Sequence, residues 1–166
     1  PCPTPDHPGM DIVFADRFPT ADGLGKFVPA DVLPPDEVPD REYPFILSTG
    51  RQLEHWHTGA MTRRAYVLDQ VNPEPVVQMN VADVAKFAIE PGDKVRISTR
   101  RGSIELKVRQ DDQVPPGVVF IPFAFVEAAA NELTNPKLDP FGKIPEFKFC
   151  AAKIEPVRGN ELQAAE

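Results

Sequence analysis

Short runs of apolar residues, several of them alternating with polar ones, dominate the chain from residue 43 onward. Each run is a few residues long and is rich in Val, Ile and Phe, which favour strands over helices. The runs cover residues 45–47, 76–79, 95–98, 104–108, 118–121 and 149–157. The pattern therefore predicts a mainly β protein of about six short strands.

Between two of these runs, residues 100–103 form a polar break that contains Gly102. A short break between two alternating strands predicts a tight hairpin, and glycine can supply a positive φ there. We expect strands 95–98 and 104–108 to pair on either side of this turn.

Two short segments favour helices. Asn80 precedes residues 81–87 as a potential N-cap, with Asp83 at the third helical position as a near capping box. A second helical stretch is expected over residues 126–133. Brief helices among short strands predict a small closed or nearly closed barrel rather than a doubly wound sheet.

The N-terminal part has a different composition. Ten of the twenty prolines fall within residues 1–44, and proline removes a backbone donor that central strands need. We expect an extended arm over residues 1–42, a barrel over 43–158 and a tail over 159–166. The aromatic residues of the arm predict a strap with short edge strands. Because the chain begins without methionine, we expect a piece of a longer protein.

Composition narrows the class of partner. The 166 residues carry 25 acidic and 18 basic side chains, a formal net charge of -7 that disfavours nucleic acid. Cys2 and Cys150 lie at opposite ends, which predicts neither a disulfide framework nor a zinc ribbon and favours a reducing, cytoplasmic location. No apolar run approaches the ~20 residues that span a bilayer, so we expect no membrane insertion.

Residues 49–64 concentrate three arginines, two of the three histidines and the single tryptophan. Glycines at 50 and 59 let backbone amides approach a phosphate, Arg51 offers a planar fork, and Thr49 and Thr58 add hydroxyl groups. This combination predicts a binding loop for a small phosphate-bearing ligand, and a solvated polar loop is the alternative.

Other candidates in the sequence have simpler explanations. His55 and His57 flank Trp56, but no further ligands accompany them, so we expect hydrogen bonds to a ligand rather than a metal site. Arg63 and Arg64 would point to opposite sides of a strand. Phe123 and Phe125 fit a core, Asn131 fits a satisfied helical position, and Lys148 fits a surface lysine.

The motifs 49–51, 54–59 and 61–64 together resemble the C-terminal domain of the molybdopterin oxidoreductases, specifically formate dehydrogenases and periplasmic-type nitrate reductases. The stretches 122–123, 131–134 and 145–151 resemble further motifs of that family in the same order. The resemblance implies a double-psi β-barrel of the aspartate decarboxylase-like class.

It also implies a cofactor, bis-molybdopterin guanine dinucleotide with molybdenum or tungsten, and the residues that bind it. The implied cofactor-binding residues are Thr49, Gly50, Arg51, Gln52, Leu53, Glu54, His55, Trp56, His57, Thr58, Phe123, Asn131 and Lys148. No metal ligand or catalytic residue is implied in this chain. Iron–sulfur clusters and an NAD site are implied only in other parts of the enzyme.

The expected function is therefore to orient this cofactor in a formate dehydrogenase large subunit, which oxidises formate to carbon dioxide. Implied partners are the N-terminal catalytic domains of the same polypeptide and other formate dehydrogenase subunits. Three alternatives remain open: the same domain of a nitrate reductase, a stand-alone cofactor-binding protein, and an interaction module that leaves the cationic loop unused.

Overall fold

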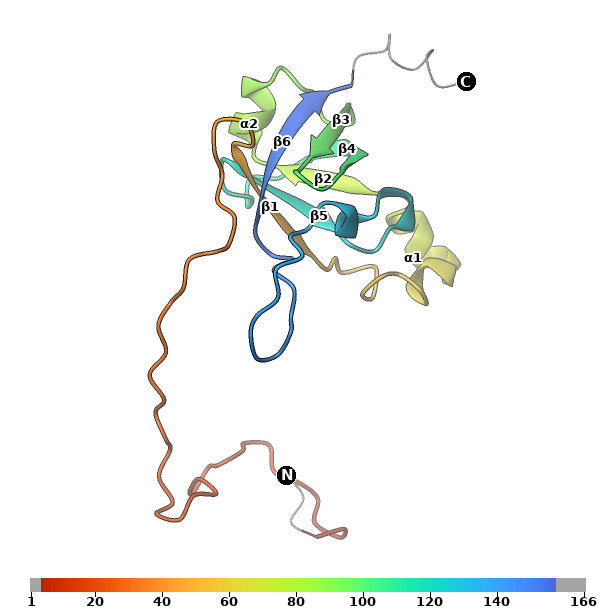
Figure 1. The fold of residues 1–166 in the computed structure, drawn as a ribbon. Coiled ribbons are helices and arrows are strands. Elements are labelled where there is room, and N and C mark those ends of the chain that lie inside the picture. The colour runs from red at the N-terminus through yellow and green to blue at the C-terminus, as the bar shows by residue number, and fades with distance from the viewer. Residues whose placement is uncertain (1–3, 158–166) are drawn as a thin grey trace. The chain divides into compact units, whose positions relative to one another are not determined.

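The computed structural model describes residues 4–157, and the chain forms two compact units that divide between Pro34 and Pro35. The second unit contains a closed barrel of six strands (Figure 1). The strands are β1 Phe45–Gly50, β2 Val76–Met79, β3 Lys94–Ser98, β4 Ser103–Gln110, β5 Val118–Pro122 and β6 Cys150–Pro156. All six strands expected from the apolar runs are confirmed.

The order of strands around the barrel is β1-β5-β2-β4-β3-β6. If three is added to every strand number, counting on from β6 to β1, the order around the ring stays the same. The parallel pair β1–β5 becomes β4–β2, and the antiparallel pair β1–β6 becomes β4–β3. Two interlocked halves with one parallel crossover each make a double-psi β-barrel, which confirms the predicted fold class.

The predicted hairpin joins β3 and β4, with Ser98 opposite Ser103. Thr99 N–H donates to the carbonyl of Gly102 at 2.9 Å. The expectation of a positive φ at Gly102 is wrong, because the described glycines with positive φ lie elsewhere. A Cβ at this position would lie 3.0 Å from the Glu132 carbonyl oxygen, so close backbone approach explains the glycine.

Helix α2, Val81–Lys86, begins as expected. The Asn80 side chain accepts a hydrogen bond from the Ala82 N–H at 2.8 Å. The near capping box does not form, because the Asp83 carboxylate instead accepts from the Gly117 N–H at 2.7 Å. Asp83 thus ties this helix to the turn before β5.

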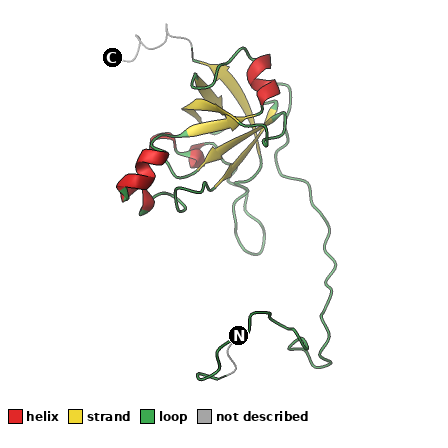
Figure 2. Cartoon of the chain, turned by 180° about the vertical axis from the view of Figure 1, so that it is seen from behind, coloured by secondary structure: helices red, strands yellow, loops and turns green. Residues whose placement is uncertain are grey.

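The other helices differ from expectation (Figure 2). Residues 126–133 form two short 3₁₀ turns, η2 Val126–Ala128 and η3 Ala130–Glu132, because Ala129 between them is extended. The sequence pattern missed η1 Thr62–Arg64 and α1 Tyr66–Val71. Arg63 and Arg64 therefore lie in a helical turn and not on a strand.

The core fills the barrel interior with alternating strand residues. Leu47, Val77, Val95, Ile97 and Val119 are fully buried. Among residues 4–157, no helix is long and apolar enough to cross a bilayer. Cys150 is buried at the start of β6, whereas Cys2 and the predicted tail at residues 159–166 lie outside the described residues.

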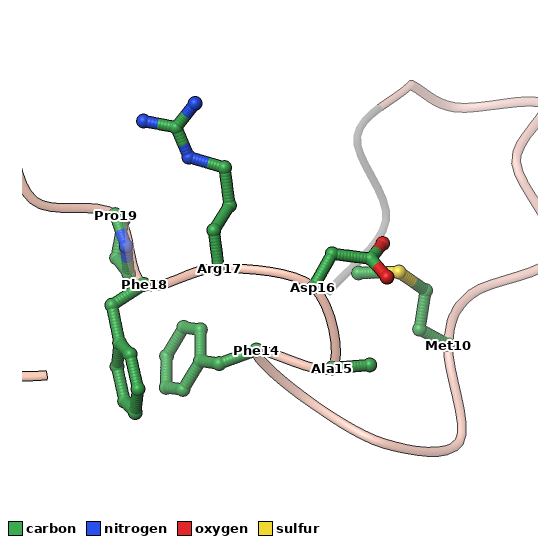
Figure 3. A pocket seen from close by; sticks show the side chains of 7 residues that line it. All are labelled: Met10, Phe14, Ala15, Asp16, Arg17, Phe18 and Pro19. Carbon is green, nitrogen blue, oxygen red and sulfur yellow. The ribbon is translucent and has the colours of Figure 1, made fainter. Parts of the chain in front are cut away.

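The first unit contains no strand within residues 4–34, so the expected edge strands are wrong. Its local order comes from turns and from one aromatic pair. The rings of Phe14 and Phe18 lie 5.3 Å apart and line a small pocket with Met10, Ala15 and Pro19 (Figure 3).

Candidate functional site

The end of β1 is held by the segment that precedes β6. The Thr49 hydroxyl donates to the Phe147 carbonyl at 2.7 Å, and the Lys148 ammonium donates to the Thr49 carbonyl at 2.6 Å. The same ammonium lies 5.8 Å from the centre of the Phe123 ring. Three predicted site residues, distant in sequence, therefore meet where β1 ends.

At Gly50, which follows Thr49, the surrounding structure leaves no room for a side chain. A Cβ here would lie 2.6 Å from the Phe120 ring, and the Gly50 carbonyl accepts from the Phe123 N–H at 3.1 Å. The glycine thus lets β1 and β5 remain close at the point where the binding loop leaves the barrel.

His55 is fully buried, and its ring makes its contacts within the protein. Nε2 lies 2.8 Å from the Asn72 carbonyl, and Nδ1 lies 3.3 Å from the Thr62 hydroxyl. A carbonyl only accepts, so Nε2 carries the hydrogen, and the ring edge also packs on Phe125. Both ring nitrogens thus have partners within the protein, through which the side chain anchors the loop, and donation from this imidazole to a ligand stays a prediction.

Trp56 and His57 lie at the outer turn of the loop. Their rings meet edge-on with centroids 4.8 Å apart, and Trp56 is exposed. His57 has a positive φ of 50°, and the Gly59 N–H closes the turn onto the Trp56 carbonyl at 2.9 Å. The buried His55 therefore precedes a closed turn in which Trp56 is exposed and His57 is half-buried.

The first part of the loop, residues 51–54, lines an open groove of about 600 Å³. Arg51, Gln52, Leu53 and Glu54 form one wall. The opposite wall carries polar residues that the sequence reasoning missed: Gln78, Arg109, Asp111 and Gln113. The sequence signal that could have indicated these residues is the polar run at the end of β4, before Pro115 and Pro116.

Two features give this groove polar binding capacity. The Gln52 side-chain nitrogen is buried without a hydrogen-bond partner in the structure. Arg109 donates to the Asn72 side chain at 2.7 Å, which ties the groove to the residue that binds His55. An unpaired amide beside two guanidinium groups suits a ligand with anionic and carbonyl oxygens.

A smaller hollow of about 180 Å³ contains the remaining predicted residues. Thr58, Phe123 and Asn131 line it together with Phe125, Val126, Ala129 and Ala130. The structure thus separates the predicted set into the Arg51 groove and the Thr58 hollow, and Thr49, Gly50 and Lys148 lie at the end of β1.

Arg63 connects the loop to the turn after β5. Its guanidinium donates to Glu127 at 2.7 Å and to Asp69 at 3.3 Å, and it lies 4.8 Å from the Phe125 ring centre. The hydrogen bond to Glu127 raises the pKa of Arg63. Arg63 is therefore a structural cation, whereas the neighbouring Arg64 is exposed.

Within residues 4–157, no group of three or more His, Cys, Asp or Glu side chains could hold a metal ion. Cys150 packs against the Leu133 carbonyl, and burial raises the pKa of its thiol. This cysteine is suited to packing rather than to thiolate chemistry.

The chain is 47% identical over 155 residues to the F420-dependent formate dehydrogenase subunit alpha of Methanocaldococcus jannaschii, covering 93% of this chain and 23% of that protein. It is 34% identical over 169 residues to the periplasmic nitrate reductase of Desulfovibrio desulfuricans, covering 93% and 22%. The chain therefore spans about a quarter of the length of these relatives.

Acetylene hydratase from Pelobacter acetylenicus shares the fold, with a TM-score of 0.64, 18% identity and coverage of 70% of this chain and 19% of that one. The model of the Molydopterin dinucleotide binding domain family matches residues 45–151. This range includes β1, the loop after it, the Arg51 groove, the Thr58 hollow and the first residues of β6. The chain belongs to the molybdopterin dinucleotide binding domain family.

Proposed function

We propose that this chain is the C-terminal part of a molybdenum or tungsten formate dehydrogenase alpha subunit, where it binds and orients bis-molybdopterin guanine dinucleotide. The observation that carries the proposal is the Arg51 groove, which two guanidinium groups, two carboxylates and three side-chain amides line beside the end of β1 in a chain of this family. The chain contributes the position of the cofactor and not a reacting group.

The chemistry of the groove fits a guanine dinucleotide. Arg51 and Arg109 supply guanidinium groups for a pyrophosphate, and Gln52 supplies a buried amide donor without a partner. Glu54 and Asp111 line the same groove, and carboxylates accept from the N–H groups of a guanine edge. Both kinds of group lie in one space of about 600 Å³, which suits part of a dinucleotide.

The end of β1 and the Thr58 hollow would hold other parts of the same cofactor. Lys148 offers a cation beside Phe123, while Thr58 and Asn131 offer a hydroxyl and an amide beside an apolar wall. In the same loop, Trp56 presents an exposed ring that meets the His57 ring edge-on. His55 contributes indirectly, because it holds the loop through Asn72 and Thr62.

The bound cofactor would supply the metal centre to which formate gives two electrons as it becomes carbon dioxide. In this proposal the chain has no catalytic residue and no metal ligand of its own. Iron–sulfur clusters and the electron-acceptor site belong to the other domains and subunits. The sequence left the electron acceptor open and implied an NAD site only in other parts of the enzyme, whereas the relative from Methanocaldococcus is F420-dependent, which favours F420 as the acceptor.

The corresponding domain of a nitrate reductase is the second candidate. The greater identity to a formate dehydrogenase, 47% against 34%, favours formate. Assays of the complete enzyme with formate and with nitrate separate the two, because nitrate reduction without formate oxidation would reverse the choice. The cytoplasmic location inferred from the cysteines stays a prediction.

The direct test is Arg51→Ala in the complete alpha subunit, with Arg41→Ala as an exposed-arginine control. Metal analysis and released guanine nucleotide measure cofactor content, and formate oxidation is assayed on the same preparation. We expect cofactor and activity to fall together in the Arg51 variant and to persist in the control. Full cofactor loading and turnover without Arg51 would contradict the proposal.

His55→Ala should also lower cofactor content and activity, but for a different reason. Removing the imidazole leaves the buried Asn72 carbonyl without its donor, which costs about 1–3 kcal/mol of stability. Urea unfolding of the cofactor-free chain therefore separates the two variants. Only the His55 variant should lose stability, because Arg51 is exposed.

A further inference from the structure

The loop between η3 and β6 projects from the barrel, away from the end that α2 covers (Figures 1 and 2). This projecting loop, residues 137–146, exposes three apolar side chains that the cofactor groove does not use. Phe141 at its tip is 93% exposed, Ile144 is 60% exposed and Leu138 is 48% exposed. Exposed apolar side chains gathered on one protrusion are typical of an interaction surface.

The backbone of the projecting loop is ordered by its own hydrogen bonds. Leu138 and Pro145 form an antiparallel bridge, and the Asp139 N–H donates to the Ile144 carbonyl at 3.0 Å. The Asp139 carboxylate accepts from the N–H groups of Phe141, Gly142 and Ile144 at 3.0, 2.6 and 2.7 Å. The tip that carries Phe141 is therefore already shaped before any partner binds.

The base of the loop is tied to the start of the barrel unit. The Glu146 carboxylate accepts from the Asp36 N–H at 3.1 Å and from the Asn135 amide at 3.0 Å. Lys137 forms an ion pair with the Asp36 carboxylate at 3.2 Å. The projecting loop thus leaves the barrel beside the segment through which the chain enters it.

On its other side the loop runs directly into the candidate site. Phe147 and Lys148 follow it, and they hold the hydroxyl and the carbonyl of Thr49. The loop that bears Phe141 is therefore attached on one side to the segment that enters the barrel unit and on the other side to the end of β1. Both places adjoin the remainder of the polypeptide under the proposed function, one through the chain itself and the other through a cofactor enclosed between domains.

We infer that Phe141 docks into an apolar pocket on the upstream portion of the same alpha subunit and locks the barrel over the cofactor. This inference rests on the proposed function, because the relatives of this chain are about four times its length. An aromatic side chain on a preshaped loop loses little conformational entropy on burial, which suits an anchor. Leu138 and Ile144 then pack around the rim of that pocket.

The test uses cysteine labelling in the complete alpha subunit. Lys143→Cys places a thiol at the tip while keeping Phe141, and Glu90→Cys places one in the exposed turn after α2. Maleimide labelling of each cysteine is quantified by peptide mass spectrometry and normalised to the denatured protein. The matched variant Phe141→Ser with Lys143→Cys removes the anchor and leaves the probe in place.

We expect labelling at position 143 to be about tenfold slower than at position 90, the factor for about 1.4 kcal/mol of opening free energy. Phe141→Ser should restore labelling to within about twofold of the reference, because the anchored tip then opens freely. Equal labelling at 143 and 90, or protection that survives Phe141→Ser, would overturn the inference. Protection that appears only with other subunits or on self-association would assign the surface to a different partner and overturn it too.

Metal and guanine nucleotide content are measured on the same samples. A preparation that carries both but labels freely at position 143 contradicts the docking of Phe141 and leaves the proposed function intact. A preparation that carries neither contradicts the proposed function, whatever the labelling rates.

Discussion

At the scale of single residues, Gly59 shows how two different constraints can require the same amino acid. Its φ is +73°, and a Cβ would lie 2.7 Å from the Ala124 carbonyl oxygen and 2.7 Å from Cγ of Arg63. Gly117 has nearly the same φ, +78°, but nothing lies within 4 Å of its Cβ position. Comparing the two glycines therefore distinguishes the effect of a positive φ, which both share, from that of steric contact, which only Gly59 has.

We predict that Gly117→Ala lowers the free energy of unfolding by about 1 kcal/mol and Gly59→Ala by about 3 kcal/mol. Both variants have the unfavourable positive φ, but only the second must also displace the Ala124 backbone. Equilibrium urea unfolding of the chain measures both values. Equal losses would mean that contact with Ala124 contributes nothing.

At the scale of elements, the tip of the projecting loop depends on one ionised carboxylate. Backbone hydrogen bonds, first from Ile144 and then from Gly142, hold the pKa of Asp139 below its usual value of 3.8. A depressed pKa means that the folded turn favours the charged form. The contribution is therefore present above pH 3.8 and is lost as pH falls through the lower, folded pKa.

We predict that the amide resonances of Phe141, Gly142 and Ile144 titrate together with a midpoint below 3.8. An NMR titration between neutral and acidic pH measures that midpoint. Asp139→Ala should abolish the shared titration and leave the amides of β3 unchanged. A midpoint at or above 3.8 would contradict the role of Asp139 in ordering the turn.

A second element-scale feature is the clamp that Glu37 forms on the β3–β4 hairpin. Its carboxylate accepts from Arg100 at 3.1 Å, from Arg101, and from the Ala151 N–H at 2.9 Å. Arg101 also donates twice to the Leu133 carbonyl. The residues just before the barrel are thereby bound to the turn and to the first residues of β6.

We predict that Glu37→Ala lowers the free energy of unfolding by about 1.5–3 kcal/mol, because two guanidinium groups and a backbone donor lose one acceptor. Glu74→Ala is the control, since it removes a surface pair with Lys107 worth about 0–1 kcal/mol. Urea unfolding midpoints at equal slope give both losses. If Glu37→Ala lost no more free energy of unfolding than Glu74→Ala, the clamp would not contribute to stability.

At the scale of the whole molecule, an acidic chain of net charge -7 brings two arginines together with three side-chain amides in a groove beside the end of β1. A ligand in this groove would contact two separate segments of the chain, because Arg51 follows β1 and Arg109 lies near the end of β4. Binding should therefore be linked to the stability of the barrel as a unit.

We predict that the cofactor-loaded alpha subunit protects β1 and β5 from hydrogen exchange more strongly than the cofactor-free protein. The difference approaches about 4 kcal/mol when free cofactor exceeds its dissociation constant about a thousandfold. Arg51→Ala should reduce this difference in protection free energy by about 1.5–3 kcal/mol, because the variant loses a charge-assisted contact with the cofactor. Equal protection with and without cofactor would indicate that the barrel does not bind it.

The sequence alone determined what depends on local pattern. Six strands, the β3–β4 hairpin and the Asn80 cap all followed from alternation, a short polar break and one capping side chain. The binding loop stood out for the same reason, because its arginine, histidines, tryptophan and glycines are neighbours in the chain. The double-psi fold came from the family resemblance, which the strand order bears out.

Only the tertiary structure decided which of these side chains are accessible. His55 and His57 look equivalent in the sequence, yet His55 is fully buried and bound to the Asn72 carbonyl, whereas His57 lies half-buried in a turn with a positive φ. Arg109 joins the groove through the parallel pairing of β2 with β4, which links residues about thirty positions apart. Partners at that separation are chosen by packing and closure of the barrel, and short-range patterns in a sequence do not contain that information.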